Sequence, residues 1–281
     1  MSSIPYDWNK RLKKDSKEFL QNITSGNYDF EVIYNAYPER VNGEVSNEIV
    51  SFVARQLCKG IIKEPHKYDD FLLFIYKQKG RTGQYIFNLI FTKLIVKYPE
   101  QYINIVQSLW KDIHDNKEMQ NLFSMVIYPL LKKYPDKYID KLFNWIREED
   151  DLVVENMFRV LERYVKYDKM RIKEIFHKSE SFWNFDNPTI KKGNVRLLRA
   201  IYKANPKFCE KIYLEYKGTH NPNFVEILCG GIAGYTREIE QEIELWAKSG
   251  NARIRKSALS ALRSIKKYKK YYTTKTPKHK E

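Results

Sequence analysis

The chain contains 281 residues, of which 43% are hydrophobic and 15% aromatic, and it carries a formal net charge of +15. That apolar content excludes a chain that is disordered throughout, and there is no run of about 18 apolar residues that could span a membrane. The first residues lack the apolar core of a secretory signal, and three widely spaced cysteines do not suit a disulfide framework. We therefore expect a cytoplasmic protein that does not insert into membranes.

A short phrase built around Tyr-Pro recurs along the chain at a nearly constant interval. Its best copies, at 97–103 and 133–139, place their prolines 36 residues apart. Looser copies lie at 64–68, 166–170 and 205–208. Similarity at a fixed interval of about 20–50 residues is typical of a repeat architecture. Proline suits the first turn of a helix and disfavours helix at the residue before it, so each phrase predicts the corner of a helix–turn–helix unit.

The segments on both sides of each corner have apolar residues at three-to-four-residue spacing, as in 85–95 and 102–110 around Pro99. This spacing indicates amphipathic helices and not strands. An aromatic residue follows ten or eleven residues after a proline at three places, which are Trp110, Trp145 and Tyr216. We interpret these rings as core between repeats and not as a platform for a ligand.

Residues 251–265 resemble the second half of a HEAT repeat, in which a polar turn residue leads into an aliphatic–Arg pair and then into alanines at helical spacing. Pro129, inside a predicted helix that ends at Lys133, is similar to that family too, because a proline bends a helix interior. The resemblance covers roughly 44–267. It implies an all-α fold, a right-handed α-α superhelix of five to seven helical pairs. We expect one domain over 1–267 and a basic, disordered tail over 268–281.

The positive charge is concentrated at the two ends of the sequence. Residues 253–281 contain eleven Lys and Arg and one acid, a net charge of +10, residues 1–17 carry +3, and the 235 residues between them carry only +2. Cations release counterions from a polyanion and tyrosine rings stack on bases, so the C-terminal part is a candidate nucleic-acid-binding segment. Its candidate contacts are Arg253, Arg255, Lys256, Lys266, Lys267, Lys269 and Lys270. The other interpretation is a solvated terminus that keeps the protein soluble.

The sequence does not group side chains that would hold a metal or a nucleotide cofactor. The five histidines are isolated from one another and from the cysteines. The glycines of 229–235 lack the spacing of a phosphate loop and indicate a tight turn or close helix packing. The acids at 148–151 precede a predicted helix, whose positive N-terminal end they would stabilise. We therefore expect no cofactor.

The segment 181–188 places aromatic rings and an acid before a basic helix. Trp183 could stack on a base, and the Asp186 carboxylate could stabilise positive charge that develops on a sugar. Lys191, Lys192 and Arg196 follow and could hold phosphate. The alternative is a helix N-cap with a hydrophobic staple, which has no catalytic role.

The chain resembles the bacterial DNA alkylation repair proteins built from HEAT-like repeats, the AlkD and AlkC type of alkylpurine DNA glycosylase. The resemblance rests on 133–154, a proline-headed helix with a late Trp before an acidic turn. The run from Trp183 to Asp186 is one residue shorter than the Trp-Asp-x-x-Asp phrase that carries the catalytic Asp in the AlkD group. The resemblance implies a protein that binds the backbone of DNA or RNA without catalysis or, if Asp186 is catalytic, a glycosylase.

A third hypothesis does not involve nucleic acid. Helical repeat arrays expose extended surfaces that bind other proteins. In this interpretation the chain is a protein-interaction scaffold with a partner along its concave face, and the basic tail is a nonspecific anchor.

Overall fold

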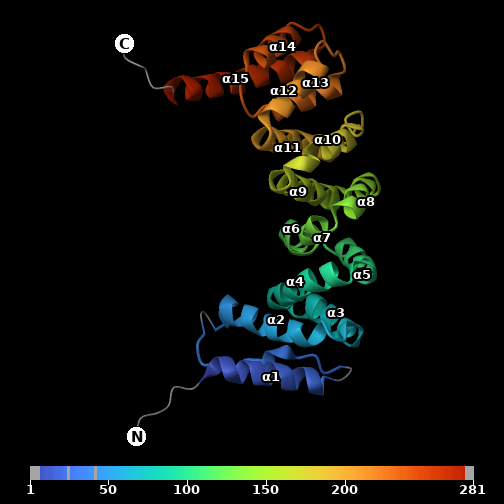
Figure 1. The fold of residues 1–281 in the computed structure, drawn as a ribbon, viewed down its shortest axis with the longest axis vertical. Helices are drawn as coiled ribbons and strands as arrows, with labels where there is room; N and C mark the ends of the chain where they lie inside the picture. Colours follow the sequence, from blue (N-terminus) through green and yellow to red (C-terminus); the bar gives the residue numbers. More distant parts are fainter. Residues whose placement is uncertain (1–6, 24–25, 41–42, 276–281) are drawn as a thin grey trace. The chain divides into compact units, whose positions relative to one another are not determined.

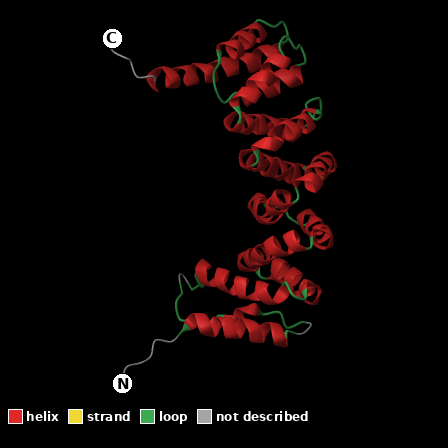
Figure 2. Ribbon diagram, viewed as in Figure 1, coloured by secondary structure: helices red, strands yellow, loops and turns green. Residues whose placement is uncertain are grey.

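The computed structural model describes residues 7–23, 26–40 and 43–275, with side chains described as far as Lys269. The predicted all-α fold is confirmed: helices make up most of this part of the chain, and it contains no strand (Figure 2). The side chain of Lys270 lies outside the described side chains. The last residues of the predicted tail, 276–281, lie outside the described residues.

The chain divides into two compact units, Met1–Lys133 and Tyr134–Glu281, a division that the predicted single domain did not include. The elements of the first unit are α1 (Trp8–Asn22), η1 (Phe30–Ile33), α2 (Asn47–Ile61), η2 (Pro65–Tyr68), α3 (Asp69–Gln78), α4 (Gly80–Lys97), α5 (Pro99–Lys111), α6 (Asn116–Leu122), η3 (Phe123–Ile127) and α7 (Tyr128–Lys133). Those of the second are α8 (Pro135–Glu148), α9 (Asp151–Tyr167), η4 (Lys169–Arg171), α10 (Ile172–Glu180), α11 (Pro188–Ala204), α12 (Pro206–Glu215), α13 (Pro222–Gly231), α14 (Arg237–Ala247) and α15 (Ala252–Lys275).

Within each unit, alternate helices along the chain pack against one another and form a row (Figure 1). In the second unit α9, α11, α13 and α15 form one row, while α8, α10 and α14 each pack against the row helix that follows. In the first unit α2, α4 and the segment from η3 to α7 form the corresponding row, and α3 and α5 pack against α4. This pairing is compatible with a helical repeat array.

The prolines of the recurring phrase begin helical elements, as predicted. Pro99, Pro135 and Pro206 are the first residues of α5, α8 and α12, and Pro65 is the first residue of the 3-10 turn η2. Tyr98 and Tyr134 precede two of them with φ of −132° and −133°, outside the helical region. A proline there costs no backbone hydrogen bond, because the first N–H groups of a helix have no partner within it.

The aromatic residues of the phrase and those that follow it lie in the core. Tyr102, Tyr138, Trp110 and Trp145 are all buried, which confirms the interpretation of the two tryptophans as core. The hydroxyl of Tyr102 donates to Asp69 Oδ1 at 2.9 Å, from one repeat to the previous one. Burial of four large rings removes much apolar surface from water, which is the main force that holds such rows together.

Polar contacts also join residues that lie about one repeat apart in sequence. Lys77 Nζ lies 3.3 Å from Asp112 Oδ2, and Gln101 Nε2 lies 2.9 Å from His66 Nδ1. Both pairs are separated by 35 residues, close to the 36 residues between Pro99 and Pro135. A residue therefore faces its counterpart in the next repeat.

The helix around Pro129 is distorted, as predicted, and the distortion is a π-helical turn, η3, between α6 and α7. Pro129 has no N–H to donate to the carbonyl of Met125, four residues earlier, and its ring would press on that carbonyl in a regular α-helix. The hydroxyl of Thr92 in α4 donates to Met125 O instead. The wider turn thus keeps the displaced carbonyl hydrogen-bonded.

The glycines of 229–235 allow close helix packing, one of the two predicted roles. A Cβ at Gly231, the last residue of α13, would lie 2.4 Å from Leu198 Cδ2 of α11. A Cβ at Gly234 would lie 1.9 Å from the hydroxyl oxygen of Tyr202. Both distances are far below van der Waals contact, so α11 approaches this segment more closely than a side chain would permit.

Helix α15 continues to Lys275, beyond the predicted domain end at residue 267. The helices of the described residues include none that is both long and apolar enough to cross a membrane.

Cys209 and Cys229 are buried, and this burial raises the pKa of each thiol to about 12. Because the thiolate is the nucleophilic form, thiols with such raised pKa values are poor nucleophiles at neutral pH.

Candidate nucleic-acid interface

The segment 181–188 connects α10 to α11, and its last residues form the predicted N-cap. The side chain of Asn187 accepts a hydrogen bond from the backbone N–H of Ile190 at 2.9 Å. Pro188 is the first residue of α11. The alternative interpretation of this segment, a helix cap, therefore describes its local structure.

Trp183 lies inside an aromatic cluster and not at the surface. Its side chain is 1% exposed, and its ring lies 5.3 to 5.7 Å, between centroids, from Phe176, Tyr216 and Phe224. Both faces of the indole are covered, so the predicted stacking of Trp183 on a base has no open ring face in this structure. Phe185, two residues on, is the ring of the segment that is 38% exposed.

Asp186 is exposed, and its charge acts on a cation from a distant part of the sequence. It lies close enough to the Arg253 guanidinium of α15 to contribute to the raised pKa of that group. Nearby, Asn221 Nδ2 donates to Asn184 Oδ1 at 2.8 Å and ties the segment to the start of α13. The fold thus places Asp186 near Arg253, a predicted nucleic-acid contact, and leaves the Asp186 side chain exposed to water.

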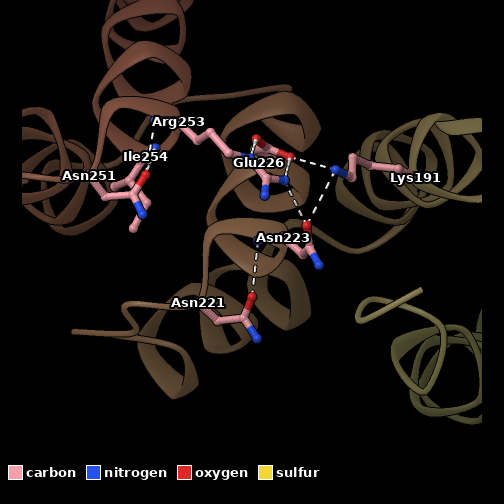
Figure 3. A network of polar contacts seen from close by, with 7 residues as sticks. All are labelled: Lys191, Asn221, Asn223, Glu226, Asn251, Arg253 and Ile254. Atoms are coloured by element: carbon pink, nitrogen blue, oxygen red, sulfur yellow. Dashed lines mark hydrogen bonds and ion pairs between the residues drawn. The ribbon is translucent and has the colours of Figure 1, made fainter. Parts of the chain in front are cut away.

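Two of the predicted cations meet at one carboxylate, in an arrangement that we call the Glu226 cluster (Lys191, Asn223, Glu226 and Arg253; Figure 3). Lys191 Nζ of α11 lies 2.6 Å from Glu226 Oε2 of α13. Arg253 of α15 donates through Nε to Oε1 at 2.8 Å and through Nη2 to Oε2 at 2.9 Å. Such a paired arrangement is the strong form of an Arg–carboxylate contact. The cluster therefore joins three successive helices of the row.

Asparagine caps hold the two ends of this cluster in position. Asn221 Oδ1 accepts from the backbone N–H of Asn223 at 3.0 Å at the start of α13 (Figure 3). Asn251 Oδ1 accepts from the N–H of Arg253 at 2.9 Å at the start of α15. Because each cap fixes the first turn of its helix, Asn223 and Arg253 project from well-defined backbone. Arg253 Nη2 also donates to Asn223 Oδ1 at 2.8 Å.

The charges of the cluster stabilise one another. Hydrogen bonds from Arg253, and then from Lys191, hold the pKa of Glu226 below its usual value. The same carboxylate raises the pKa of the Arg253 guanidinium. Glu226 is therefore an anion at neutral pH, and it neutralises one of the two positive charges that approach it.

The other predicted cations of α11 contact acids of α9, in an arrangement that we call the Glu155 cluster (Glu155, Arg159, Glu162, Lys192 and Arg196). Arg196 Nη1 lies 3.4 Å from Glu155 Oε1, and its Nη2 lies 2.8 Å from Glu162 Oε1. Lys192 Nζ is more distant, 3.9 Å from Glu155 Oε1, with a side chain that is 66% exposed. Arg159, in the same helix as Glu155, is the main cause of the lowered pKa of that carboxyl.

Apart from Arg253, the basic residues of α15 with described side chains fall into two groups. Arg255 and Lys269 have partners within the fold: Arg255 Nη1 donates to Ser249 O at 2.9 Å in the turn between α14 and α15, and Lys269 Nζ lies 2.5 Å from Glu240 Oε2. Lys256, Arg263, Lys266 and Lys267 are exposed, and none forms an ion pair with a described residue. Arg263 and Lys267 follow Lys256 by seven and eleven residues, so the three side chains lie on one face of the helix. We call these three residues the α15 stripe.

The acids of both clusters are the partners of the predicted cations that sequence reasoning missed. Lys191 and Glu226 are separated by 35 residues, the same interval that relates contacts elsewhere in the chain. Writing the sequence in rows of that length would have placed Glu226 beside Lys191. Arg253 and Glu226 are 27 residues apart, and the sequence offered no such signal for that pair.

Comparisons with known proteins do not assign the chain to a family. No protein-family model and no curated protein matches it. Among solved structures, a crystal structure of an engineered protein from the Northeast Structural Genomics Consortium aligns with 91% of this chain and 98% of its own, at 12% identity and a TM-score of 0.30.

Proposed function

We propose that this chain is a helical repeat protein that binds the phosphate backbone of DNA, of the HEAT-like alkylation-repair type but without catalysis. The observation that carries the proposal is the α15 stripe, Lys256, Arg263 and Lys267, on a helix whose sequence contains no acid between Ala252 and Lys275. Cations that have no acidic partner are available to replace the counterions of a polyanion.

The stripe has the dimensions of a backbone contact. Lys256 and Lys267 are eleven residues apart, which corresponds to about 16 Å along an α-helix. Lys266 lies beside the stripe and adds a fourth cation. The buried residues Ile254, Ala258, Ala261 and Ile265 hold the opposite face of α15 against the unit. The charged face is therefore presented on ordered backbone, which supports a defined site over a nonspecific tail.

The cations of the two clusters have a different role in this proposal. Lys191 and Arg253 share the Glu226 carboxylate, and Arg196 contacts both Glu155 and Glu162. Releasing them to a phosphate would leave those acids without their partners. We propose that they fix the row of helices, and that Lys192, which has the longest ion pair of the group, contributes a contact outside α15.

The test is a binding titration of a fluorescently labelled DNA duplex and single strand with the full chain at several salt concentrations. The variant carries Lys256→Gln, Arg263→Gln and Lys267→Gln. We expect the slope of log K against log salt to become shallower by about one for each phosphate contact that is lost. The matched control carries Lys173→Gln, Lys207→Gln and Lys211→Gln, three exposed lysines of α10 and α12.

An equal loss of affinity in the two triple variants would contradict the proposal, because both remove three positive charges. Failure of the unmodified chain to bind duplex or single strand at low salt would remove it. That second outcome would favour the scaffold hypothesis, which is supported by a groove of about 620 Å³ across α2, α4 and η3 in the first unit. Leu89, Met125 and Pro129 contribute apolar surface to this groove.

The glycosylase hypothesis has less support. It requires a stacked base beside Asp186, and the nearest tryptophan, Trp183, is buried. Retained duplex binding with no release of an alkylated purine would agree with the proposal. Release that is lost in Asp186→Asn and kept in Asp151→Asn would restore the glycosylase.

A further inference from the structure

A second concentration of cations lies in the first unit, where five lysines line one cavity of about 500 Å³. Two of them have neutral partners: Lys59 Nζ donates to Gln56 Oε1 at 3.4 Å, and Lys67 Nζ lies over the Tyr68 ring. Lys13 and Lys17 come from α1, Lys59 from α2, Lys63 from the segment that follows α2, and Lys67 from η2. Glu64 is the one acid among the lining residues. The cavity therefore collects cations from segments that are about 50 residues apart in the sequence.

The cavity is built on a close contact between two helices. A Cβ at Gly60 in α2 would lie 2.4 Å from Leu20 Cδ1 of α1, so a side chain at residue 60 would require the Leu20 side chain to move. Leu20 and Tyr68 are buried, and the Tyr68 hydroxyl donates to Leu20 O at 3.4 Å. These residues give the cavity a packed floor from which the lysine side chains extend.

The lysines of the cavity are not neutralised by the surrounding protein. Other cations of α1 have acidic partners one turn away: Arg11 Nε lies 2.6 Å from Asp15 Oδ2, and Lys14 Nζ lies 3.5 Å from Glu18 Oε1. Among the residues that the structure describes, Lys13, Lys17 and Lys63 form no ion pair. Glu64 can offset one of the five positive charges, the remaining like charges repel one another, and a bound anion would relieve that repulsion.

We propose that this cavity binds an anion that carries several adjacent phosphate groups. Each ammonium group is a compact point charge with three donors, which suits phosphate oxygens. A single carboxylate would leave most of the positive charge uncompensated, whereas an oligophosphate matches several lysines within one small volume. Gln21 and Gln56 also line the cavity and supply neutral amide donors.

The phosphates can belong to a free oligophosphate or to a nucleic-acid backbone. The site lies in the first unit and shares no residue with the α15 stripe, so it does not depend on the proposed function. The variants used for the two proposals are also separate, and each can fail while the other holds.

The test is isothermal titration of the full chain with inorganic tripolyphosphate, and in a second arm with single-stranded DNA. The cavity variant carries Lys13→Gln, Lys17→Gln and Lys63→Gln, and the control is the Lys173→Gln, Lys207→Gln, Lys211→Gln triple. We expect tripolyphosphate affinity to fall about tenfold to a hundredfold in the cavity variant and to change little in the control. Thermal unfolding of both variants verifies that these exposed substitutions leave the fold intact.

The α15 triple variant should bind tripolyphosphate as the unmodified chain does. A loss in the cavity variant that is confined to the DNA arm would assign the phosphates to a nucleic-acid backbone. The proposal is overturned if the cavity variant and the control bind both ligands equally, or if the unmodified chain binds neither ligand saturably.

Discussion

At Glu226 a single carboxylate accepts hydrogen bonds from cations of two other helices, Lys191 of α11 and Arg253 of α15. Its surroundings are partly wet, because its side chain is 19% exposed and that of Arg253 is 53% exposed. Solvent screening therefore limits what the cluster contributes to stability. Its larger effect is positional, since it fixes the registry of three neighbouring helices.

Replacing Glu226 with Gln should lower the free energy of unfolding at neutral pH, by up to about 1 kcal/mol for a partly exposed ion pair. The folded-state pKa of Glu226 is lowered from 4.5, so its stabilisation is fully present above that unfolded-state value. It is lost as the pH falls through the lower folded-state pKa. Urea unfolding at a series of pH values should show the difference between the two proteins shrinking below about pH 4.5.

Glu215→Gln is the matched control, because Glu215 is an exposed acid at the end of α12. Its effect should be close to zero at every pH. A Glu226→Gln variant that is as stable as the unmodified chain at neutral pH would contradict the role of the cluster.

The sequence predicted the cations of this site better than their environment. Lys191, Lys192, Arg196 and Arg253 are brought near Asp186 or near one another by the fold, but three of the four have close acidic partners. Composition and local spacing count charges without pairing them. Pairing depends on which residues of the next repeat lie alongside, and the interval of about 35 residues gives that information only for some pairs.

At the scale of the helices, α9 and α11 pack against each other at a glycine, Gly193. A Cβ at Gly193 would lie 2.2 Å from Cδ2 and 2.4 Å from Cγ of Phe158. Phe158 is fully buried, so its ring cannot move into free space. The close packing of this helix pair therefore depends on the absence of a side chain at residue 193.

Gly193→Ala should reduce the free energy of unfolding by about 1–3 kcal/mol through overpacking, although alanine is the better helix former. Gly250→Ala is the control, since a Cβ there would meet no atom within 4 Å. Urea unfolding monitored by circular dichroism measures both variants. A Gly193→Ala protein at least as stable as the unmodified chain would show that α9 and α11 can separate at no cost.

Element boundaries were largely predictable because proline acts locally. Pro99, Pro135 and Pro206 each begin a helix, because a proline fixes its own φ and disfavours helix at the residue before it. The π-helical turn before Pro129 was not predicted in that form. Its stability depends on the Thr92 hydroxyl, which comes from another helix, and sequence periodicity does not contain that contact.

At the scale of the whole molecule, cations without ion pairs are concentrated at two places. One is the cavity of five lysines in the first unit, and the other is the exposed face of α15 in the second. The sequence revealed the concentration of charge at both ends. It did not reveal which cations lie on ordered backbone without forming an ion pair, and that distinction separates a binding site from a charged terminus.

Removal of residues 276–281 from the 281-residue chain tests this distinction. The segment contains Lys278, Lys280 and Glu281, so its removal lowers the net charge by one and leaves the α15 stripe intact. We expect DNA affinity at low salt to fall by less than about threefold, because few phosphate contacts are lost. The stripe variant should lose much more in the same titration. If the truncated chain no longer binds DNA while the stripe variant does, the binding belongs to a nonspecific terminal anchor, and the repeat array is better explained as a scaffold for a protein partner.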